Sequence, residues 1–381
     1  MSRSFDVCIR GAGMVGSTLA LLLSQQRLRV ALVGPNTAPP PPAATDVRAY
    51  SLNAASKRIL ESVRAWPQAA EMDGVPPAIT PVSRMVVQGD LGATLTFDAA
   101  DVNETALNWM VDVPALEARL AQAVQFQGQI ERFQSDGVAH PAEPTAKLTV
   151  VCEGRRSSTR AALGMNFDSR SYPHRALAAR LQLSQPHQGV ARQWFCEQGI
   201  VALLPLGGEQ GTEAALVWST PPEQLNTLVA AAPHDFLAHL NAICMPDATA
   251  ITLTQTPQVW PLEFAQASQW TTHGLALAGD AAHAMHPLAG QGLNVGLADV
   301  ATLAQVLQER EYWRELGDPR LLRRYERSRK AAFARMGGLT DGLFHLFQQD
   351  QPALRTLRNW GMHRLNQLPA AKRWLTWQAM A

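Results

Sequence analysis

The chain has 381 residues, of which 46% are hydrophobic and 17% charged, and its formal net charge is +1. At roughly 100–200 residues per domain, this length predicts about two domains, and the apolar share excludes a disordered chain. A charge so close to zero gives no global field for nucleic acid, so no nucleic-acid partner is expected. No apolar run reaches the ~18 residues that cross a bilayer, and the first residues leave no room for a signal peptide.

The four cysteines lie far apart in the sequence and form no C-x-x-C pair; they are Cys8, Cys152, Cys196 and Cys244. Each lies in or beside an apolar run. This pattern predicts reduced core thiols of a cytoplasmic protein, and no metal site is expected.

The first predicted element is a β-branched strand at residues 5–10. The glycine cluster G-A-G-M-V-G follows at residues 11–16, before a Leu- and Ala-rich helix at 17–26 and a second buried strand at 29–33. A strand, a glycine-rich turn, a helix and a strand in this order are typical of dinucleotide binding. The alternative is an ordinary glycine-rich turn between a strand and a helix.

The three glycines of this cluster have separate tasks in a dinucleotide-binding unit. Gly11 permits the tight turn, Gly13 lets the backbone approach a pyrophosphate, and Gly16 lets the helix pack close to the strand. The helix N-terminus then offers unpaired N–H groups and a partial positive charge to the phosphates. The predicted cofactor-binding residues here are Gly11, Gly13, Met14, Val15 and Gly16.

The second strand lacks the acidic residue that usually ends it. Asp or Glu at that position holds the adenosine ribose hydroxyls, whereas this strand ends in Val33 and Gly34. Loss of such a charge-assisted hydrogen bond costs about 1.5–3 kcal/mol of binding. Either Asn36 or a backbone group replaces the acid, or the cofactor is held less tightly.

The middle of the chain predicts an antiparallel sheet that forms a substrate domain. Its strands are expected at residues 82–88, 94–97, 172–183, 193–206, 214–219 and 251–257. The cofactor domain is expected to be discontinuous, and the chain is expected to end in helices. The predicted ranges are 1–75, 101–170 and 265–325 for the cofactor domain, 76–100 and 171–264 for the substrate domain, and 326–381 for the helical region.

A second motif, G-D-A-A-H-A-M-H-P-L-A-G-Q-G-L-N, covers residues 279–294 directly after an apolar strand at 275–278. Asp280 falls at the carboxyl end of that strand, where ligands bind in open α/β sheets, and its carboxylate can accept hydrogen bonds from polyol hydroxyls. Pro287 and Gly290 interrupt the chain before a helix at residues 293–307. Alternatively, Asp280 is a solvent-exposed acid before an ordinary loop.

The two motifs together resemble those of the flavin-dependent aromatic hydroxylases, the class A flavoprotein monooxygenases that include para-hydroxybenzoate hydroxylase. The resemblance implies an α/β fold with a para-hydroxybenzoate hydroxylase-like FAD-binding domain, an antiparallel-sheet substrate domain and C-terminal helices. It implies that Asp280 binds the ribityl chain of FAD and that backbone N–H groups at residues 290–294 face the N1/O2 edge of the flavin. The residues it places at the cofactor are Asp280, Pro287, Gly290, Gln291, Gly292, Leu293 and Asn294.

Two further stretches carry the same resemblance. The sequence V-V-C-E-G-R-R-S-S-T-R at residues 150–160 resembles the D-G motif of the family, with Glu153 in place of Asp, and the family assigns this segment to FAD and reduced nicotinamide. The sequence D-V-R-A-Y-S-L at residues 46–52 is similar to the ubiquinone-biosynthesis hydroxylases and places Arg48 among the cofactor-binding residues. His174 stands where many members carry Gln.

The resemblance implies an FAD-dependent oxidoreductase with NAD(P)H as electron donor and O2 as co-substrate. Its reaction would be hydroxylation of an aromatic ring through a flavin hydroperoxide, and its substrate a polyprenylated phenol or quinone precursor in ubiquinone biosynthesis. The protein would stabilise negative charge on the flavin and exclude water. The expected wall of the hydrophobic substrate pocket is Trp194, Leu204, Pro205 and Met285.

Three other functions are compatible with parts of the sequence. A non-catalytic or weakly FAD-binding paralogue that helps a quinone-biosynthesis complex assemble would account for Gly34 and Glu153. A halogenase would ordinarily contain W-x-W-x-I-P, which the sequence lacks. A plain NAD-dependent dehydrogenase would leave the motif at residues 279–294 unexplained.

The sequence after Asp350 is basic and contains no acidic residue; its cations are Arg355, Arg358, Arg364, Lys372 and Arg373. Tryptophan and leucine residues are interleaved with them. A basic amphipathic segment of this kind can lie on anionic lipid or contact a biosynthetic complex, and the alternative is a helix packed on the body with a solvated basic face. We therefore expect a cytoplasmic protein that can associate peripherally with the inner face of the membrane.

Overall fold

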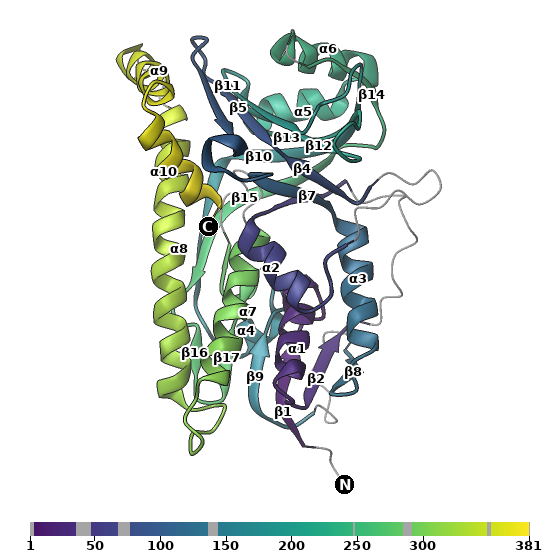
Figure 1. Cartoon of the computed structure of the whole chain (residues 1–381), viewed down its shortest axis with the longest axis vertical. Helices are drawn as coiled ribbons and strands as arrows, with labels where there is room; N and C mark the ends of the chain where they lie inside the picture. The colour runs from purple at the N-terminus through teal and green to yellow at the C-terminus, as the bar shows by residue number, and fades with distance from the viewer. Residues whose placement is uncertain are drawn as a thin grey trace.

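The computed structural model describes residues 4–35, 47–67, 77–135, 144–246, 248–284, 292–348 and 352–380. Two sheets make up most of the molecule, and Figure 1 shows them one above the other. The lower sheet contains the N-terminal strand. The upper sheet is formed mainly by the middle of the chain.

The lower sheet has the strand order β16-β17-β9-β1-β2-β8, and all its neighbours except β16 and β17 pair in parallel. Its strands are β1 (Phe5–Arg10), β2 (Val30–Gly34), β8 (Ile130–Gln134), β9 (Ala146–Val151), β16 (Thr271–Thr272) and β17 (Leu275–Leu277). Val7 and Ile9 of β1 pack in the main core, while Phe5 and Cys8 pack in a smaller cluster. Both faces of β1 are therefore buried, which explains its continuous apolar sequence.

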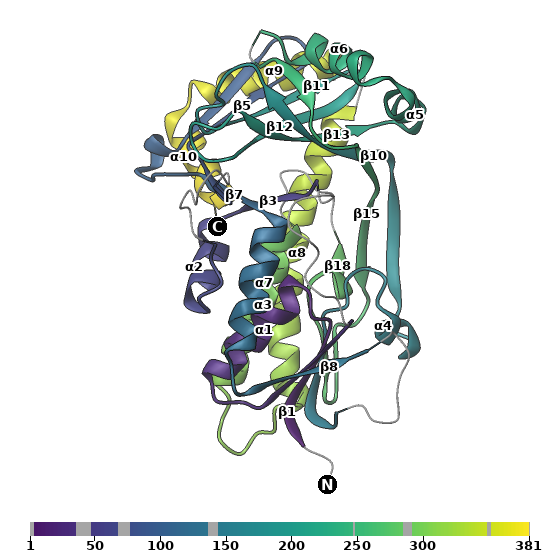
Figure 2. The same ribbon diagram turned by 90° about the vertical axis from the view of Figure 1, so that its right-hand side faces the viewer.

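Several helices contribute apolar side chains to the main core beside this sheet. Three of them, α1 (Met14–Gln25), α3 (Val113–Gln125) and α7 (Gly292–Gln308), lie next to one another in Figures 1 and 2. Because the first glycine motif runs into the start of α1 and the second runs into the start of α7, this packing brings the two motifs to the same edge of the sheet.

The upper sheet is mostly antiparallel, with the order β18-β15-β10-β13-β12-β11-β5-β6 and β14 paired to β10. Its strands are β5 (Arg84–Gln88), β6 (Thr94–Asp98), β10 (Phe167–Leu183), β11 (Val190–Cys196), β12 (Gly199–Leu206), β13 (Glu213–Thr220), β14 (Ala250–Leu253), β15 (Gln258–Ala267) and β18 (His283–Ala284). Helices α5 (Pro222–Ala230) and α6 (Pro233–Cys244) share a hydrophobic cluster with one face of the sheet. The long strands β10 and β15 run down one side of the molecule (Figure 2).

A small third sheet lies between the two large ones. Its order is β3-β7-β4, with β3 (Ala49–Leu52), β4 (Ile79–Val82) and β7 (Asn108–Asp112). Shorter elements complete this part of the chain: α2 (Ala54–Ser62), η1 (Ala99–Val102), α4 (Ser158–Ala162) and η2 (Gly279–Ala281).

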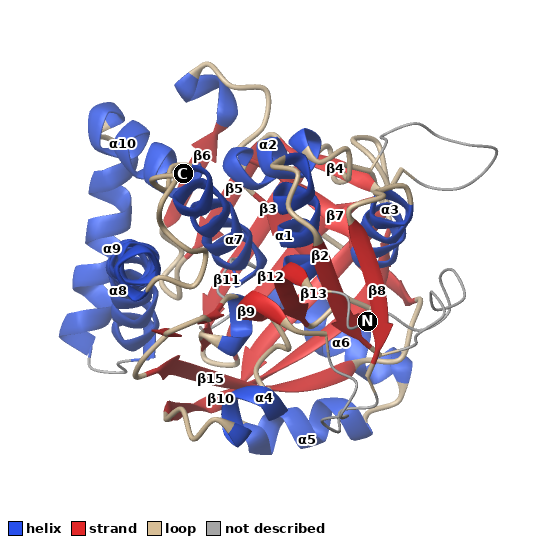
Figure 3. Cartoon of the chain, turned by 90° about the horizontal axis from the view of Figure 1, so that it is seen from below, coloured by secondary structure: helices blue, strands red, loops and turns tan. Residues whose placement is uncertain are grey.

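The C-terminal helices lie together at one side of the sheets, which is clearest from below (Figure 3). They are α8 (Pro319–Gln348), α9 (Pro352–Asn366) and α10 (Pro369–Met380), and α8 runs along both large sheets in Figure 1. Helices α9 and α10 are tied to the body by polar contacts. Asn359 Nδ2 donates to Asp90 Oδ1 at 2.8 Å, and Lys372 Nζ lies 2.8 Å from Asp101 Oδ2.

The predicted glycine-turn unit and the antiparallel sheet are both present, but three predicted strands differ. The strand expected at 193–206 is two strands, β11 and β12. Residues 82–88 belong to two sheets, because the backbone of Ser83 pairs with Gly189 and Ala99 and ends β4 there. The strand expected at 251–257 is β14, which ends at Leu253. The expected domain boundaries at 170 and 265 fall inside β10 and β15, and the domain division stays a prediction. No helix in the described ranges is long and apolar enough to span a membrane.

Candidate cofactor and substrate site

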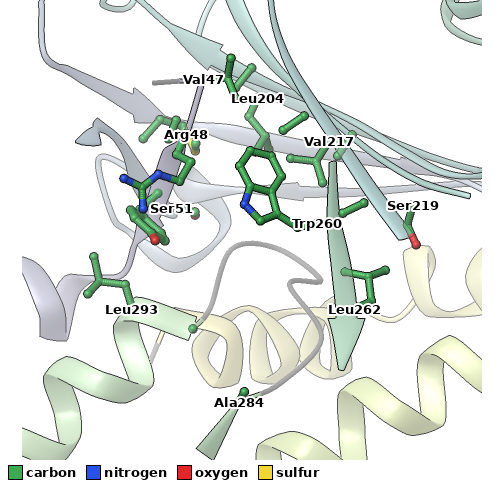
Figure 4. Close-up of a pocket in the computed structure, with 18 of the residues that line it drawn as sticks. Val47, Arg48, Ser51, Leu204, Val217, Ser219, Trp260, Leu262, Ala284 and Leu293 are labelled. Atoms are coloured by element: carbon green, nitrogen blue, oxygen red, sulfur yellow. The ribbon is translucent and has the colours of Figure 1, made fainter. Parts of the chain in front are cut away.

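A cavity of about 590 Å³ lies between the two large sheets (Figure 4). The first glycine motif contributes Gly13, Met14 and Val15 to its lining, and the second contributes Asp280. The start of α7, the predicted cofactor residue Arg48 and one face of the upper sheet complete the lining. Segments almost 300 residues apart in the sequence therefore share one binding space.

The first glycine motif has the geometry that its sequence predicts. Gly11 has a φ of 110°, and a β-carbon there would overlap the carbonyl group of Cys152. A β-carbon at Gly16 would overlap the carbonyl of Gly11, whereas one at Gly13 would meet no atom within 4 Å. Two glycines thus permit close packing, and the third leaves the backbone open at the cavity, where the first N–H groups of α1 have no intrahelical partner.

Val15 joins the two motifs directly. A β-carbon at Gly279 would lie 3.2 Å from Val15 Cγ1, and a β-carbon at Gly296 would lie 2.9 Å from Val15 Cγ2. The valine side chain therefore occupies the space that side chains at these two positions would need. This contact fixes the start of α1 against both the turn that carries Asp280 and the first turns of α7.

Asp280 lies in η2, at the carboxyl end of β17, and its side chain is accessible from the cavity. The surrounding protein raises the pKa of this carboxyl by desolvation, while the charges of His283 and Arg155 act in the opposite direction. A carboxylate that faces a cavity can accept hydrogen bonds from donors such as polyol hydroxyls.

A buried ionic network holds the Asp280 turn in place. Asp299 of α7 is fully buried, and its Oδ2 accepts hydrogen bonds from His283 Nε2 at 2.6 Å and from the Gly279 N–H at 3.0 Å. Arg329 of α8 donates from Nε to Asp299 Oδ1 at 2.7 Å. His283 is committed to this network and does not line the cavity. It therefore has a structural role.

The segment around Glu153 forms a second support. Glu153 accepts hydrogen bonds from Ser157, from the N–H and hydroxyl of Thr159, and from Arg10. Burial acts to raise the pKa of Glu153, but these donors outweigh it and lower the pKa. Arg160 of the same motif donates to the carbonyl of Ala281 at 2.9 Å, so the motif braces η2. Glu153, which is longer than the Asp of the family motif, therefore fits this position.

The start of α7 is fixed by Asn294. Its Oδ1 accepts from the Asn53 N–H at 3.1 Å and from the Ser56 hydroxyl at 2.7 Å, and its Nδ2 donates to the Ser51 carbonyl at 2.8 Å. Gly292 and Leu293 line the cavity, but Asn294 does not. The side chain of this predicted cofactor residue is therefore used to position the helix.

Arg48 enters the cavity from the segment before β3 (Figure 4). Arg180 of β10 holds that segment, because its guanidinium donates to the carbonyls of Val47 and Arg48 and to Asp112 Oδ1. The placement of Arg48 thus depends on a strand of the upper sheet.

The predicted substrate wall is only partly present. Leu204 lines the cavity together with Ala202 on β12, whereas Pro205 is buried on the other side of that strand. Trp194 packs in the cluster beneath α5 and α6 and not in the cavity. Trp194 and Pro205 therefore do not line this cavity; because both faces of these strands are apolar, the sequence does not show which face borders it. The predicted residues Met285, Pro287, Gly290 and Gln291 lie outside the described ranges.

The sequence prediction missed the small side chains that create the cavity. We call these lining residues of the upper sheet the alanine face: Ala176, Ala178, Ala191, Ala202, Ala215 and Val217. They alternate with buried residues such as Leu177 and Leu216. Small residues at every second position of these strands are the sequence pattern that could have indicated the cavity.

Comparison with known proteins places the chain in a family. Residues 4–337 match the family described as FAD binding domain, and the chain belongs to it. Similar proteins are the uncharacterised protein slr1300 of Synechocystis (30% identical, covering 97% of this chain and 91% of that protein) and ubiquinone hydroxylase UbiL of Rhodospirillum rubrum (28%, 98% and 89%). The 3-demethoxyubiquinol 3-hydroxylase of Escherichia coli is also similar (28%, 97% and 96%).

The fold resembles that of p-nitrophenol 4-monooxygenase PnpA from Pseudomonas putida, with a TM-score of 0.73 and 17% identity over 99% of this chain and 98% of that one. These findings confirm the predicted fold, family and enzyme class, an FAD-dependent aromatic hydroxylase. FAD is the cofactor, and NAD(P)H is the reductant typical of the family.

Proposed function

We propose that this protein hydroxylates the aromatic ring of a polyprenylated phenol or quinone precursor in ubiquinone biosynthesis. The observation that carries the proposal is the single cavity that both glycine motifs and Asp280 share with the alanine face. Relatives named for hydroxylation of ubiquinone precursors, which match nearly the whole chain, support the substrate class. When bound, FAD supplies the redox and oxygen chemistry.

The residues of the chain divide the remaining work between them. The N-terminus of α1 would bind the pyrophosphate, and Asp280 would accept hydrogen bonds from the ribityl hydroxyls. The N-terminus of α7, which carries Gly292, would offer partial positive charge to the electron-rich edge of the flavin ring. The alanine face keeps water from the reacting atoms.

One position does not fit the usual cofactor contacts. A β-carbon at Gly34 would lie 2.5 Å from the β-carbon of Ala12, so the end of β2 has no room for the acid that would hold the adenosine ribose. This misfit favours the alternative of a weakly FAD-binding assembly protein. Glu153 does not favour it, because that side chain is fully hydrogen-bonded.

Purification with bound flavin and a substrate-dependent reaction would test the proposal. We expect flavin absorbance in the purified protein, or saturable uptake of added FAD, and faster NAD(P)H consumption when 2-geranylphenol is added. Asp280→Ala should weaken FAD binding by roughly ten- to a hundredfold, because a charge-assisted hydrogen bond contributes about 1.5–3 kcal/mol. A wild-type protein that takes up no FAD would overturn the hydroxylase proposal in favour of the assembly role.

We further propose that the surface of α9 and α10 binds an anionic membrane. Four large apolar side chains are exposed there: Trp360 (56%), Leu368 (55%), Trp374 (59%) and Trp377 (50%). We call them, with the exposed Arg364 and Arg373, the tryptophan face. Tryptophan favours the membrane–water interface, and the cations complement anionic lipid headgroups.

The side of α9 and α10 opposite the tryptophan face packs against the body of the protein. Asn359 and Lys372 contact the body, and Met362 and Thr376 are buried. The helices are therefore amphipathic and fixed in place, with the apolar and basic side facing outward. Because a polyprenylated substrate resides in the membrane, this orientation would bring the protein to its substrate.

A further inference from the structure

Trp260 is a large aromatic residue that lies beside the alanine face. Trp260 of β15 pairs in register with Ala176 of β10, which in turn pairs with Ser219 of β13. Trp260 also lines the cavity. The residues that pair in register beside it, Ala176 and Ser219, are small.

Figure 4 shows the Trp260 indole projecting into the cavity. Leu204 and Val217 lie beside it, while Leu293 and Ala284 are on the side of the cofactor motifs. The ring is only half-buried and belongs to none of the hydrophobic clusters formed by the described residues. It is therefore not placed there to fill the core.

The indole N–H of Trp260 has no acceptor among the described residues, in contrast to two buried tryptophans. Trp218 Nε1 donates to the Gln198 carbonyl at 3.0 Å, and Trp270 Nε1 donates to the Ala267 carbonyl at 3.1 Å. Tryptophan N–H groups usually find a partner when they leave water. A ligand with an oxygen substituent would provide that partner for Trp260.

We propose that Trp260 positions the aromatic ring of the substrate and determines which ring carbon reacts. The indole face packs against the ring, and Nε1–H donates a hydrogen bond to a phenol or carbonyl oxygen. Packing fixes the plane of the ring, and the hydrogen bond fixes its rotation within that plane. This inference rests on the proposed aromatic hydroxylation and identifies the residue that gives it selectivity.

Two variants separate the two contacts. Trp260→Phe keeps an aromatic surface but removes the N–H, so we expect a mixture of hydroxylated products with only a small loss of affinity. Trp260→Leu removes both contacts, and the Kd for 2-geranylphenol should rise about tenfold, as aromatic packing and a hydrogen bond are lost. More of the NAD(P)H consumed by Trp260→Leu should appear as hydrogen peroxide.

The controls distinguish this inference from the proposed function. The Kd for FAD should stay within about twofold in both variants, and Trp313→Phe in the exposed connection between α7 and α8 should match the wild type throughout. If the wild type hydroxylates 2-geranylphenol and both Trp260 variants give the same Kd and product ratio, the role of Trp260 is refuted while the function stands. If the wild type neither binds nor hydroxylates this phenol, the proposed function fails as well.

Discussion

At the scale of single residues, the contact between Gly34 and Ala12 changes the expectation for cofactor affinity. From the sequence alone, an acid at position 34 would be expected to tighten FAD binding, because it would restore a ribose contact. In the structure, the β-carbon of Ala12 lies where the new side chain would begin. An acidic side chain at position 34 would therefore clash with Ala12, and this clash opposes the gain from a ribose hydrogen bond.

We predict that Gly34→Glu weakens FAD binding, because β2 and the glycine turn must move apart. The double variant Ala12→Gly/Gly34→Glu removes the conflicting β-carbon and should bind FAD several-fold more tightly than Gly34→Glu alone, within the roughly 1.5–3 kcal/mol of a charge-assisted hydrogen bond. Isothermal titration of each apoprotein with FAD measures the effect. Tighter binding by the single variant would show that β2 yields easily and that the conflict is unimportant.

The positions of site residues could be predicted from the sequence where the spacing of a motif defines them. Gly13 and Asp280 line the cavity, and Gly11 and Gly16 pack tightly against neighbouring backbone; their part in cofactor binding stays a prediction. The substrate wall could not be predicted in this way. Trp194 and Leu204 are both apolar residues in apolar strands, and only the packing of α5 and α6 shows which face of the sheet is filled.

At the scale of elements, the Asp299 network connects β18, α7 and α8 around the turn that carries Asp280. Desolvation acts to raise the pKa of Asp299, but His283 and Arg329 outweigh it and lower the pKa below its ordinary value of 3.8. A lowered pKa in the folded state means that this carboxylate stabilises the fold above about pH 4 and that its contribution is lost as the pH falls further.

We predict that Asp299→Asn lowers the free energy of unfolding by about 3–5 kcal/mol near neutral pH, because it leaves Arg329 without its buried counter-charge. Thermal denaturation followed by circular dichroism measures the loss. Asp318→Asn is the matched control, since Asp318 pairs with Arg314 at the surface and little change in Tm is expected. Equal Tm values for the two variants would contradict a structural role for the network.

The elements of the cofactor unit were predictable because strand, turn and helix follow one another within 30 residues. The break at Ser83 was not, because it depends on backbone pairing with Gly189, more than 100 residues later. The expected strand at residues 193–206 is the hairpin of β11 and β12, whose turn interrupts a nearly continuous apolar sequence.

At the scale of the whole molecule, the tryptophan face and a second exposed aromatic pair allow a controlled test of membrane binding. Tyr312 and Trp313 are 93% and 66% exposed in the connection between α7 and α8. Figure 1 places that connection at the opposite end of the molecule from α9. The two sites share aromatic exposure but lie on different surfaces.

We predict that the wild type floats with vesicles that contain phosphatidylglycerol and much less with pure phosphatidylcholine vesicles. Trp374→Ser/Trp377→Ser should reduce the partition coefficient by about tenfold or more, because each ring loses apolar area that the lipid would cover. Tyr312→Ser/Trp313→Ser should float like the wild type. Equal flotation of both double variants, or binding that ignores lipid charge, would contradict a membrane role for the tryptophan face.

The wedge of Val15 between Gly279 and Gly296 also sets an order of events during synthesis. A nascent chain that has emerged only as far as residue 270 contains Val15 but neither of the glycines that enclose its side chain, nor β17 at the sheet edge. Because domains fold as their last strands and helices emerge from the ribosome, the nucleotide can be captured only late in translation. Cofactor loading thus reports that nearly the whole polypeptide has been made and folded.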